Sequence, residues 1–382
     1  MNLEWIVEDG ENTLGRATKF EIEGIKNISP LHALTKREIE IAERYNRTKD
    51  LGNNNLIVAG ESLAYPTFSG VGDNSSIRDA LFERMKQKMV KGKVNLIHTR
   101  IPHQYDTNGR IIDINKVSEL QASGLVGIQL EADASAIIPP LNSGLSSITA
   151  FNTVYERTKT EIETMNKEKD IIGYIPRTSS LGLIPDMVKN YIKDGIRFFA
   201  VDFSSSPLDR WLIRTVAVAI RTNLKIKGRI GENSDKYYYL HLFNVSPNRK
   251  SELPVSPITD ILTHAYGVDS TSGVVWGGGK IVKEKIRYYN MQDYGAYRIG
   301  CLDENNINYD KRLIEGSAIS VYEKLRTERI VGYKKECELI SQTMGENKIS
   351  GYAPYLLSKV RAKKDVNTAL IDIKEIRANS KT

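Results

Sequence analysis

The chain has 382 residues, of which 40% are hydrophobic and 26% are charged, and this composition is typical of a folded globular protein rather than a disordered one. Its 54 Lys and Arg residues against 47 Asp and Glu residues give a formal net charge of +7, a mild bias toward polyanionic partners that decides nothing alone. Only two cysteines, Cys301 and Cys337, are present, which excludes a disulfide framework and a four-cysteine zinc site.

The N-terminal stretch MNLEWIVEDGENT has no basic start followed by an apolar core, so it does not resemble a secretory signal. No run of the sequence approaches the ~18 apolar residues of a membrane span. We therefore expect a soluble, unprocessed, cytoplasmic protein without a membrane segment. The sequence indicates no metal and no cofactor.

Short apolar runs alternate with amphipathic stretches from about residue 55 to 290, a rhythm typical of repeated β-α units. The first predicted strand covers 55–60 and the first predicted helix covers 75–90. Two extended arms around the Asn108-Gly109 turn predict a hairpin over 94–114. The next helices are expected at 113–123, 146–167, 184–195, 208–224 and 256–267, and the next strands at 125–133, 170–176, 196–203 and 236–245.

Strands separated by helices in this order predict parallel strands joined by right-handed crossovers. With the stretch 264–280 included, the number of predicted strands is near eight. This number favours an α/β fold of the (β/α)8 TIM-barrel type, with a doubly wound open sheet as the second choice. Past residue 300 long charged segments look helical, so we expect a barrel domain over 1–300 and a basic helical extension over 301–382. Lysine and arginine near 324–335 and 359–364 indicate either a solvated helical face or a nucleic-acid contact surface.

Acidic residues stand at or just beyond the expected ends of four strands: Glu61, Asp133, Asp202 and Asp269. Because the carboxyl ends of barrel strands carry the active site, several carboxylates there would converge on one mouth and suit an acid, a base or a nucleophile. The alternative for each of them is a helix cap or a buried acid that pairs with arginine.

Three stretches resemble tRNA-guanine transglycosylases in the same order along the chain. The segment HLFNVSP (241–247) with ITDILTHAYGVDSTSGVVWGGG (258–279) is similar to the family's nucleophile region, and SELQASGLVGIQLEAD (118–133) to its base-recognition segment. LIVAGES (56–62) lies where the family has ILTDSGG. The resemblance covers roughly residues 55 to 280.

The resemblance implies an enzyme, a pentosyltransferase that exchanges guanine in nucleic acid for a 7-deazaguanine through a covalent aspartyl intermediate. Asp269 would be the nucleophile and Glu61 would transfer the proton. Ser62, Asp133 and Asp202 would contact the base, which must leave its stack to reach the barrel mouth.

The sequence also departs from the family's pattern. Aligning Asp269 with the nucleophile needs a short gap, and without the gap Ser272 takes that place and the nucleophile is missing. The family's glutamine is replaced around Pro176 and Arg177, and its Gly-Gly by Asp202-Phe203. The three-cysteine-plus-histidine zinc subdomain is absent, which leads us to favour DNA slightly over tRNA as the substrate.

Other motifs are less specific. GVVWGGGK (273–280) fails the phosphate-loop pattern, although Lys280 and Arg287 are candidates for phosphate contacts and Trp276 for base stacking or core packing. The five histidines are too scattered to indicate a metal site.

The expected partners are nucleic acid and a free 7-deazaguanine base, with a homodimer as one expected assembly. Two other functions stay open. One is a catalytically inactive barrel that binds nucleic acid or serves as an accessory subunit, and the other is an unrelated barrel lyase or hydrolase that uses the same carboxylates.

Overall fold

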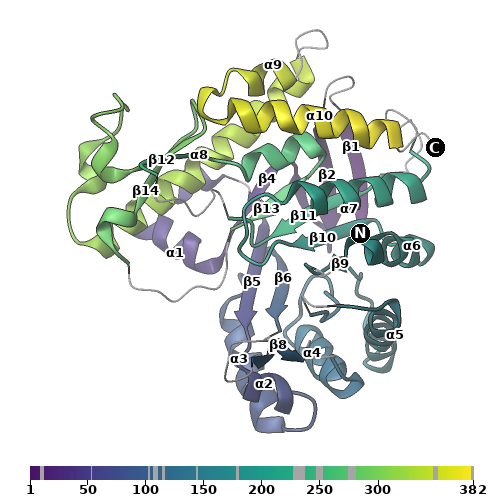
Figure 1. Ribbon diagram of the computed structural model, residues 1–382. Helices are drawn as coiled ribbons and strands as arrows, with labels where there is room; N and C mark the ends of the chain where they lie inside the picture. The colour runs from purple at the N-terminus through teal and green to yellow at the C-terminus, as the bar shows by residue number, and fades with distance from the viewer. Residues whose placement is uncertain are drawn as a thin grey trace.

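The computed structural model describes residues 1–8, 13–52, 54–101, 104–105, 111–113, 117–142, 145–177, 180–226, 237–246, 253–273, 281–346 and 352–379. Figure 1 shows parallel strands at the centre of the molecule with helices around them. The α/β class expected from the sequence is confirmed. Within the described ranges, no helix combines the length and the apolar character that crossing a bilayer requires.

The central sheet has five parallel strands in the order β4–β13–β11–β10–β9. Two more parallel strands, β5 and β6, pair with each other. Isolated parallel bridges extend the pairing beyond these sheets, from Leu34 to Ile57, from Leu96 to Ala136 and from Ile137 to Ile171. The strands are β4 (Leu31–Ala33), β5 (Leu56–Ser62), β6 (Val94–Arg100), β9 (Gly173–Ile175), β10 (Phe198–Asp202), β11 (Tyr239–Phe243) and β13 (Ser270–Ser272).

The pairing register sorts the side chains of these strands onto two faces, because paired residues point to the same side and successive residues alternate. Tyr174 and His241 both pair with Ala200, and Asp202 pairs with Phe243. The His98 ring packs against both Tyr174 and Phe243, with centroids 5.4 and 4.5 Å apart. We call this side the inner face, and the side toward the helices the outer face.

Helices follow most of the parallel strands. Asn74, Ser118, Ser147 and Asp209 each accept a hydrogen bond from the first turn of the helix that they precede, which explains where these helices begin. The helices of this part are α1 (Lys36–Arg44), α2 (Tyr65–Gly70), α3 (Ser75–Gln87), α4 (Glu119–Glu131), α5 (Ile148–Thr164), α6 (Ile184–Lys193) and α7 (Arg210–Asn223).

The strand predicted over 125–133 is wrong, because these residues form the second half of α4 and the turn after it. Ser118 and Gln121 make a capping box that starts this helix. Most of α4 is buried on every side, so its unbroken apolar run has no helical period and is typical of a buried strand as well. In place of the helix predicted over 113–123, helix α4 begins at Glu119.

The predicted hairpin is confirmed in part. Strands β7 (Gln104–Tyr105) and β8 (Ile111–Asp113) pair antiparallel, but most of the expected first arm is the parallel strand β6. The helix expected over 256–267 is a shorter 3-10 helix, η4 (Ile261–Tyr266), preceded by strand β12 (Val255–Pro257).

An antiparallel sheet formed by β1 (Asn2–Glu8), β2 (Arg16–Ile22) and β3 (Ile25–Ile28) covers the amino ends of the parallel strands. Its Phe20 ring lies 4.3 Å from the Tyr239 ring and 6.1 Å from the Phe198 ring, at the first residues of β11 and β10. The amino end of the parallel strands is therefore covered by protein, and the carboxyl end is the one left for a site.

A small antiparallel sheet of β12, β15 (Gly295–Arg298) and β14 (Arg287–Asn290) lies before residue 300, within the stretch expected to belong to the barrel. The described chain beyond residue 300 is mainly helical, as expected. Its helices are α8 (Ala318–Glu346), α9 (Tyr352–Leu357) and α10 (Lys363–Asn379). Asp372 of α10 accepts hydrogen bonds from Arg210 of α7 and from Tyr266 of η4, which fasten this helix to the rest of the chain. Short 3-10 helices complete the description: η1 (Thr48–Leu51), η2 (Leu181–Leu183), η5 (Lys283–Lys285), η6 (Ile299–Cys301), η7 (Lys311–Ile314) and η8 (Val360–Ala362).

Candidate functional site

A cluster of polar side chains lies on the inner face near the carboxyl ends of β6, β9, β10 and β11. Its centre is Asp202, the last residue of β10, which is only 2% exposed. The Asp202 carboxylate accepts hydrogen bonds from Asn244 Nδ2 at 2.8 Å and from the backbone N–H and hydroxyl of Ser204, both at 2.9 Å. Its hydrogen-bond partners among the described residues are neutral groups, and no lysine or arginine of the described ranges forms an ion pair with it, although the charge of Arg100 acts on His98 and Tyr174.

Tyr174 and His98 join this cluster through hydrogen bonds that lead from Asp202 over Asn244 to His98 and on to Tyr174. Burial raises the pKa of the Tyr174 hydroxyl well above its usual value, and the charge of Asp202 and a hydrogen bond to it raise this pKa further. His98 Nε2 lies 3.0 Å from the Tyr174 oxygen, and His98 Nδ1 lies 3.4 Å from Asn244 Nδ2.

The contact with Asn244 assigns the His98 proton. Asn244 Nδ2 can only donate, so His98 Nδ1 accepts, which places the ring proton on Nε2, where it is donated to the Tyr174 oxygen. Burial lowers the pKa of His98, which keeps the ring neutral near pH 7. The cluster is therefore preorganised around one carboxylate by four neutral residues, Ser204, Asn244, Tyr174 and His98.

The backbone after β10 and β11 bends sharply beside this cluster. Ser204, Ser205 and Asn244 have φ angles of 49°, 67° and 56°, in the left-handed region that non-glycine residues seldom adopt. The Ser205 N–H donates to the Asn244 carbonyl at 3.0 Å, so the two bends support each other. They turn Ser204 and Asn244 back toward Asp202.

Deeper on the same face lies a second polar pair, in which His241 Nδ1 is 2.7 Å from Ser270 Oγ. Burial lowers the pKa of His241 to about 3, so this ring is neutral as well. Nearer the rim, the register pairs Ser62 with Arg100, two residues beyond the Gly60–His98 pair, so both belong to the inner face. Ser62 is exposed there, at the carboxyl end of β5.

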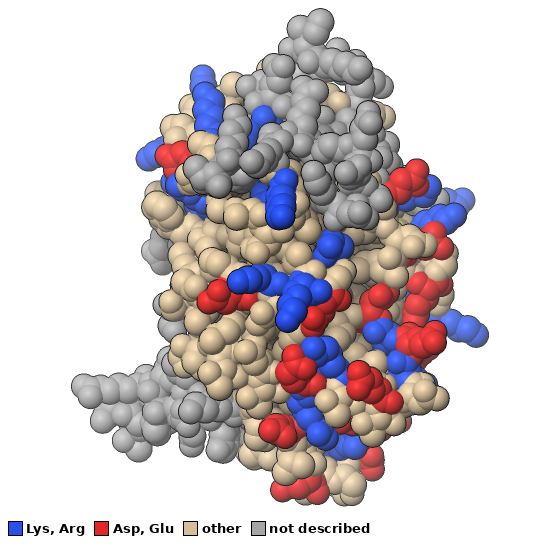
Figure 2. All heavy atoms as spheres, turned by 90° about the vertical axis from the view of Figure 1, so that its right-hand side faces the viewer, with Lys and Arg blue, Asp and Glu red and all other residues tan. Residues whose placement is uncertain are grey.

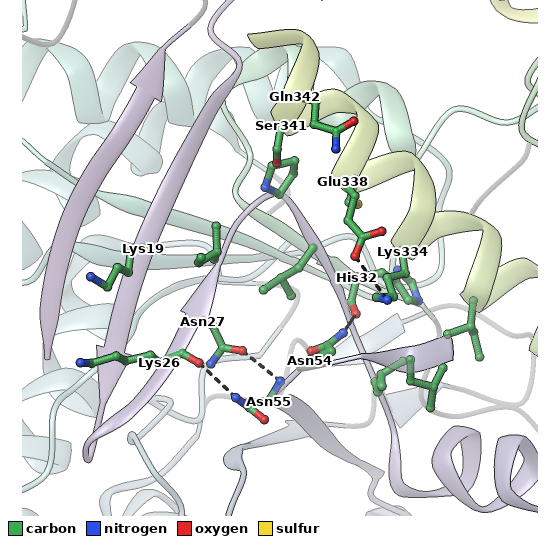
Figure 3. A pocket seen from close by; sticks show the side chains of 17 residues that line it. Lys19, Lys26, Asn27, His32, Asn54, Asn55, Lys334, Glu338, Ser341 and Gln342 are labelled. Atoms are coloured by element: carbon green, nitrogen blue, oxygen red, sulfur yellow. Dashed lines mark hydrogen bonds and ion pairs between the residues drawn. The ribbon is translucent and has the colours of Figure 1, made fainter. Parts of the chain in front are cut away.

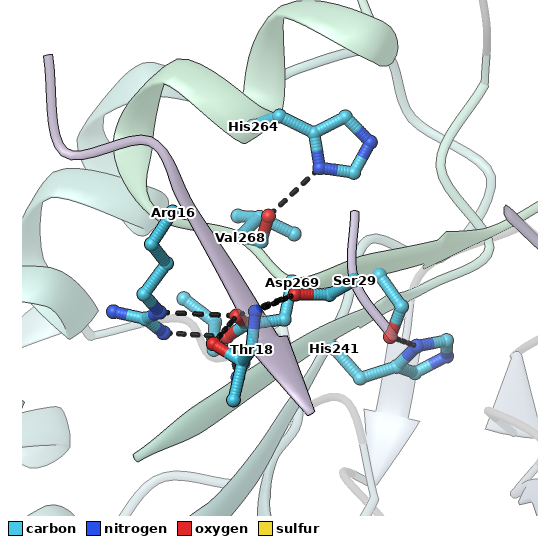
Figure 4. Close-up of polar contacts among 9 residues, drawn as sticks. Arg16, Thr18, Ser29, His241, His264, Val268 and Asp269 are labelled. Atoms are coloured by element: carbon cyan, nitrogen blue, oxygen red, sulfur yellow. Dashed lines mark hydrogen bonds and ion pairs between the residues drawn. The ribbon is translucent and has the colours of Figure 1, made fainter. Parts of the chain in front are cut away.

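Asp269 lies elsewhere, and its assignment as the nucleophile must be corrected (Figure 4). It precedes the first residue of β13, at the amino end of the parallel strands, and is 0% exposed. The guanidinium of Arg16 donates to both carboxylate oxygens, and Thr18, Ser29 and the Leu240 N–H donate as well. This carboxylate is paired with an arginine and lies at the covered amino end of the strands, so it does not face the carboxyl end, where a substrate would bind.

Ser272 holds the place at the carboxyl end of β13 instead, as the alignment without a gap has it. It is 1% exposed and shares a face with Ser270, two residues earlier. The strand-end position of β13 therefore carries a hydroxyl and not a carboxylate.

Glu61 needs a similar correction. It follows Gly60, which pairs with the inner-face His98, so its own side chain points to the outer face. There it forms an ion pair with Lys88 and lies 3.7 Å from Arg84 of α3. A carboxylate between two cations on the helix side does not suit a general base at the mouth.

Asp133 does not lie in the expected site either. The segment before it, which was predicted to be a strand, is helix α4. Asp133 lies in the turn after this helix, with 80% of its side chain exposed and its carboxylate 2.7 Å from Lys169 Nζ. It comes just before the Ser135–Ile137 segment that pairs with β6 and Ile171, at the amino end of the parallel strands. It therefore cannot reach a base at the opposite end.

Of the expected nucleic-acid contacts, Lys280 and Trp276 lie outside the described residues. Arg287 is in β14, and its guanidinium donates to the carbonyls of Ala296 and Leu253, both at 2.8 Å, which indicates a structural role. Near the cluster itself the exposed cation is Arg177, which follows β9 and donates to Ser206.

Positive and negative side chains are mixed on one face of the molecule. Figure 2 shows Lys and Arg interspersed with Asp and Glu over the described part of the face around α5 and α6. No group of metal-ligating side chains occurs among the described residues. The net positive charge thus gives no sign of a single basic patch on that face.

Asp202 was predicted as a site residue from the sequence, but the residues around it were not. The sequence places His98 within the predicted hairpin and singles out neither Tyr174 nor Asn244. The available signal was a polar side chain at or near the carboxyl ends of β6, β9 and β11, and the pairing register is needed to see that these ends meet. Neither a scan against protein-family models nor a search of curated proteins gave a match for this chain.

Proposed function

We propose that the parallel strands close into a (β/α)8 barrel and that the cluster around Asp202 is its active site. The bridges from Leu34 to Ile57, from Leu96 to Ala136 and from Ile137 to Ile171 support closure, because they connect the ends of both parallel sheets. In such barrels the active site lies at the carboxyl ends of the strands. Asp202 is at that end and on the inner face.

The reaction that we propose is the exchange of guanine in nucleic acid for a 7-deazaguanine, with Asp202 in place of Asp269 as the reacting carboxylate. One observation carries this choice. Glu61, Asp133 and Asp269 are each neutralised by a lysine or arginine, whereas the described partners of Asp202 are neutral. A carboxylate keeps its nucleophilic and proton-accepting capacity when no cation is bound to it.

In the first half-reaction an Asp202 oxygen bonds to the anomeric carbon as the bond from that carbon to the guanine nitrogen breaks. Guanine leaves with the electron pair and takes up a proton from solvent, and the incoming base returns one to solvent in the second half-reaction. In the second half-reaction the ring nitrogen of the incoming base attacks the same carbon, the carboxylate leaves and the nitrogen loses its proton. Protons and electrons balance over the two steps, and Ser204 and Asn244 hold the carboxylate in position through their hydrogen bonds.

Arg100 and Arg177 stand at the ends of β6 and β9, on the side from which the polymer would approach. Arginines there suit the phosphates that flank an extruded nucleotide. DNA stays slightly favoured over tRNA, because the sequence lacks the zinc subdomain of the tRNA-specific family.

A second candidate is a catalytically inactive barrel that binds nucleic acid. The ion pairs of Asp269 and Glu61 favour this alternative. The resemblance gives both carboxylates catalytic roles, but Asp269 is paired with Arg16 and Glu61 with Lys88. Under this alternative Asp202 recognises donor groups of a base and no bond is broken.

The experiment is to incubate the full chain with guanine-containing DNA or tRNA and with labelled guanine or 7-deazaguanine, and to measure the label in the polymer. We expect incorporation that Asp202→Asn lowers by at least about 100-fold. Asp133→Asn, the same change at an exposed acid, is the matched control and should leave the rate within about twofold. Thermal unfolding of both variants checks that each is folded.

Binding of the polymer without incorporation by the wild-type protein would support the inactive barrel. Incorporation that survives Asp202→Asn would show that another group reacts and would overturn the assignment of Asp202.

A further inference from the structure

A cavity of about 640 Å³ lies between β3, β4, the start of β5 and α8, and no residue of the Asp202 cluster lines it (Figure 3). Its volume is within the range of small-molecule sites. The walls come from segments far apart in the sequence, with β2 and β3 on one side and the second half of α8 on the other. Neither the expected function nor the proposed one uses this cavity.

The floor of the cavity is apolar. Leu34, Leu51 and Ile330 belong to one buried cluster between β4, β5 and α8, and each of them lines the cavity. On the β3 side Ile28 lines it as well, and this isoleucine is 58% exposed. Exposed apolar surface in a concave place is typical of small-molecule sites, because a bound molecule can cover it.

The charged side chains around the cavity are paired, so the lining is neutral as a whole. Each lysine of the wall has a carboxylate partner: Lys19 with Glu4 at 2.7 Å, Lys26 with Glu21 at 4.0 Å and Lys334 with Glu338 at 3.3 Å. Figure 3 shows the amino ends of Lys19 and Lys26 pointing away from α8, which leaves their hydrocarbon stems on the cavity side. A charged ligand would find no free countercharge in this lining.

Most polar groups of the wall are bonded within the protein. Asn54 Nδ2 donates to the His32 carbonyl, and Asn55 Nδ2 donates to the Lys26 carbonyl at 3.1 Å. Asn27 Oδ1 accepts the Asn55 N–H at 3.0 Å, and Asn27 Nδ2 is buried, so it offers no contact to a ligand. Burial lowers the pKa of His32 to about 4, so this ring is neutral near pH 7. The wall therefore does not favour an ion or a strongly polar molecule.

We propose that this cavity binds a neutral, mainly apolar small molecule. Its apolar body packs against Ile28, Leu34 and Ile330. A hydroxyl or amide group on it bonds to Ser341 or Gln342, the uncharged polar side chains of the α8 wall. The site is separate from the glycosyl-transfer chemistry and does not rest on it.

The test uses the full chain and N-phenylnaphthylamine, an uncharged aromatic amine whose fluorescence rises in apolar sites. We expect one saturable site in the folded protein. Its affinity should change by less than about twofold when sodium chloride rises from about 50 to about 500 mM, because salt screens only charges. Anilinonaphthalene sulfonate, which has the same rings and a negative charge, should bind at least about tenfold more weakly, because its charge would lose water without gaining a cation.

Two variants locate the bound amine. Ile28→Lys places a charge in the cavity wall and should weaken binding by at least about tenfold. Ile371→Lys is the matched control and should leave the affinity within about twofold, since Ile371 is 59% exposed on α10 and does not line the cavity. Ser341→Trp fills the cavity from the α8 side and should weaken binding by at least about tenfold as well.

Thermal unfolding checks that each variant is folded. The proposal is overturned if the wild-type protein binds the amine at no single saturable site, or if folded Ile28→Lys and Ser341→Trp proteins bind it as tightly as the wild type. Tighter binding of the sulfonate than of the amine would overturn the neutral class of the ligand.

Discussion

Four acids at or near predicted strand ends have different roles, and their partners decide which role each has. Arg16 reaches Asp269 across 253 positions of the sequence, and Lys88 reaches Glu61 across 27. No local pattern shows such a pairing in advance. The sequence could therefore identify acids near strand ends, but only the tertiary contacts could separate the one carboxylate with neutral partners from the three with cationic partners.

We predict that Asp269 contributes to stability and not to chemistry. Asp269→Asn should lower the free energy of unfolding by about 3–5 kcal/mol, because it leaves the guanidinium of Arg16, which is 3% exposed, without its countercharge. Urea unfolding followed by circular dichroism measures this loss.

Asp133→Asn is again the control, since an exposed acid beside a lysine should change stability by about 1 kcal/mol or less. The double variant Arg16→Met with Asp269→Leu should lose less than the two single losses combined, because it removes both charges. A fully stable Asp269→Asn protein would contradict the structural role.

At the scale of elements, the alternation of strands and helices is largely predictable because turn residues and apolar periods are local properties. The strands beginning near 56, 198 and 239 and the helices beginning near 75, 148 and 210 lie where the sequence places them. Helix α4 was missed because a helix buried all round has the same apolar run as a buried strand. The N-terminal sheet was not predicted at all, although it covers one end of the parallel strands.

The capping box of α4 gives a prediction at this scale. Ser118→Ala removes the oxygen that accepts the Gln121 N–H, so it should lower the free energy of unfolding by about 1 kcal/mol. Ser146→Ala is the matched control, because Ser146 is exposed and stands one residue before the cap of α5. Equal losses in the two variants, measured by urea unfolding, would show that the cap is not what starts α4.

At the scale of the whole molecule, the buried histidines couple stability to pH. Four of the five histidines, His32, His98, His241 and His264, are buried, and burial lowers the pKa of each of them. The values are about 4 for His32 and about 3 for His241. The folded protein thus keeps neutral imidazoles at pH values where the unfolded chain takes up protons.

Asp260 acts in the opposite direction. Burial raises its pKa to about 6, so below that pH the folded state binds a proton that the unfolded chain still lacks. The effect of Asp260 on the pH dependence of stability offsets that of about one histidine, so the effect of the four histidines together is larger. Stability is therefore fully present above about pH 6.5, the ordinary pKa of histidine, and falls as the pH is lowered toward the depressed pKa values.

The last prediction isolates one of these groups. Each buried histidine contributes a slope of up to about 1.4 kcal/mol per pH unit between its unfolded and folded pKa values. His241→Asn keeps an N–H near Ser270 but cannot titrate, so between about pH 5.5 and 4 its unfolding free energy should fall less steeply than that of the wild type, by about one such slope. Urea unfolding at a series of pH values measures both curves. Parallel curves would mean that His241 takes up its proton equally in the folded and unfolded states, which contradicts a neutral ring buried beneath the Asp202 cluster.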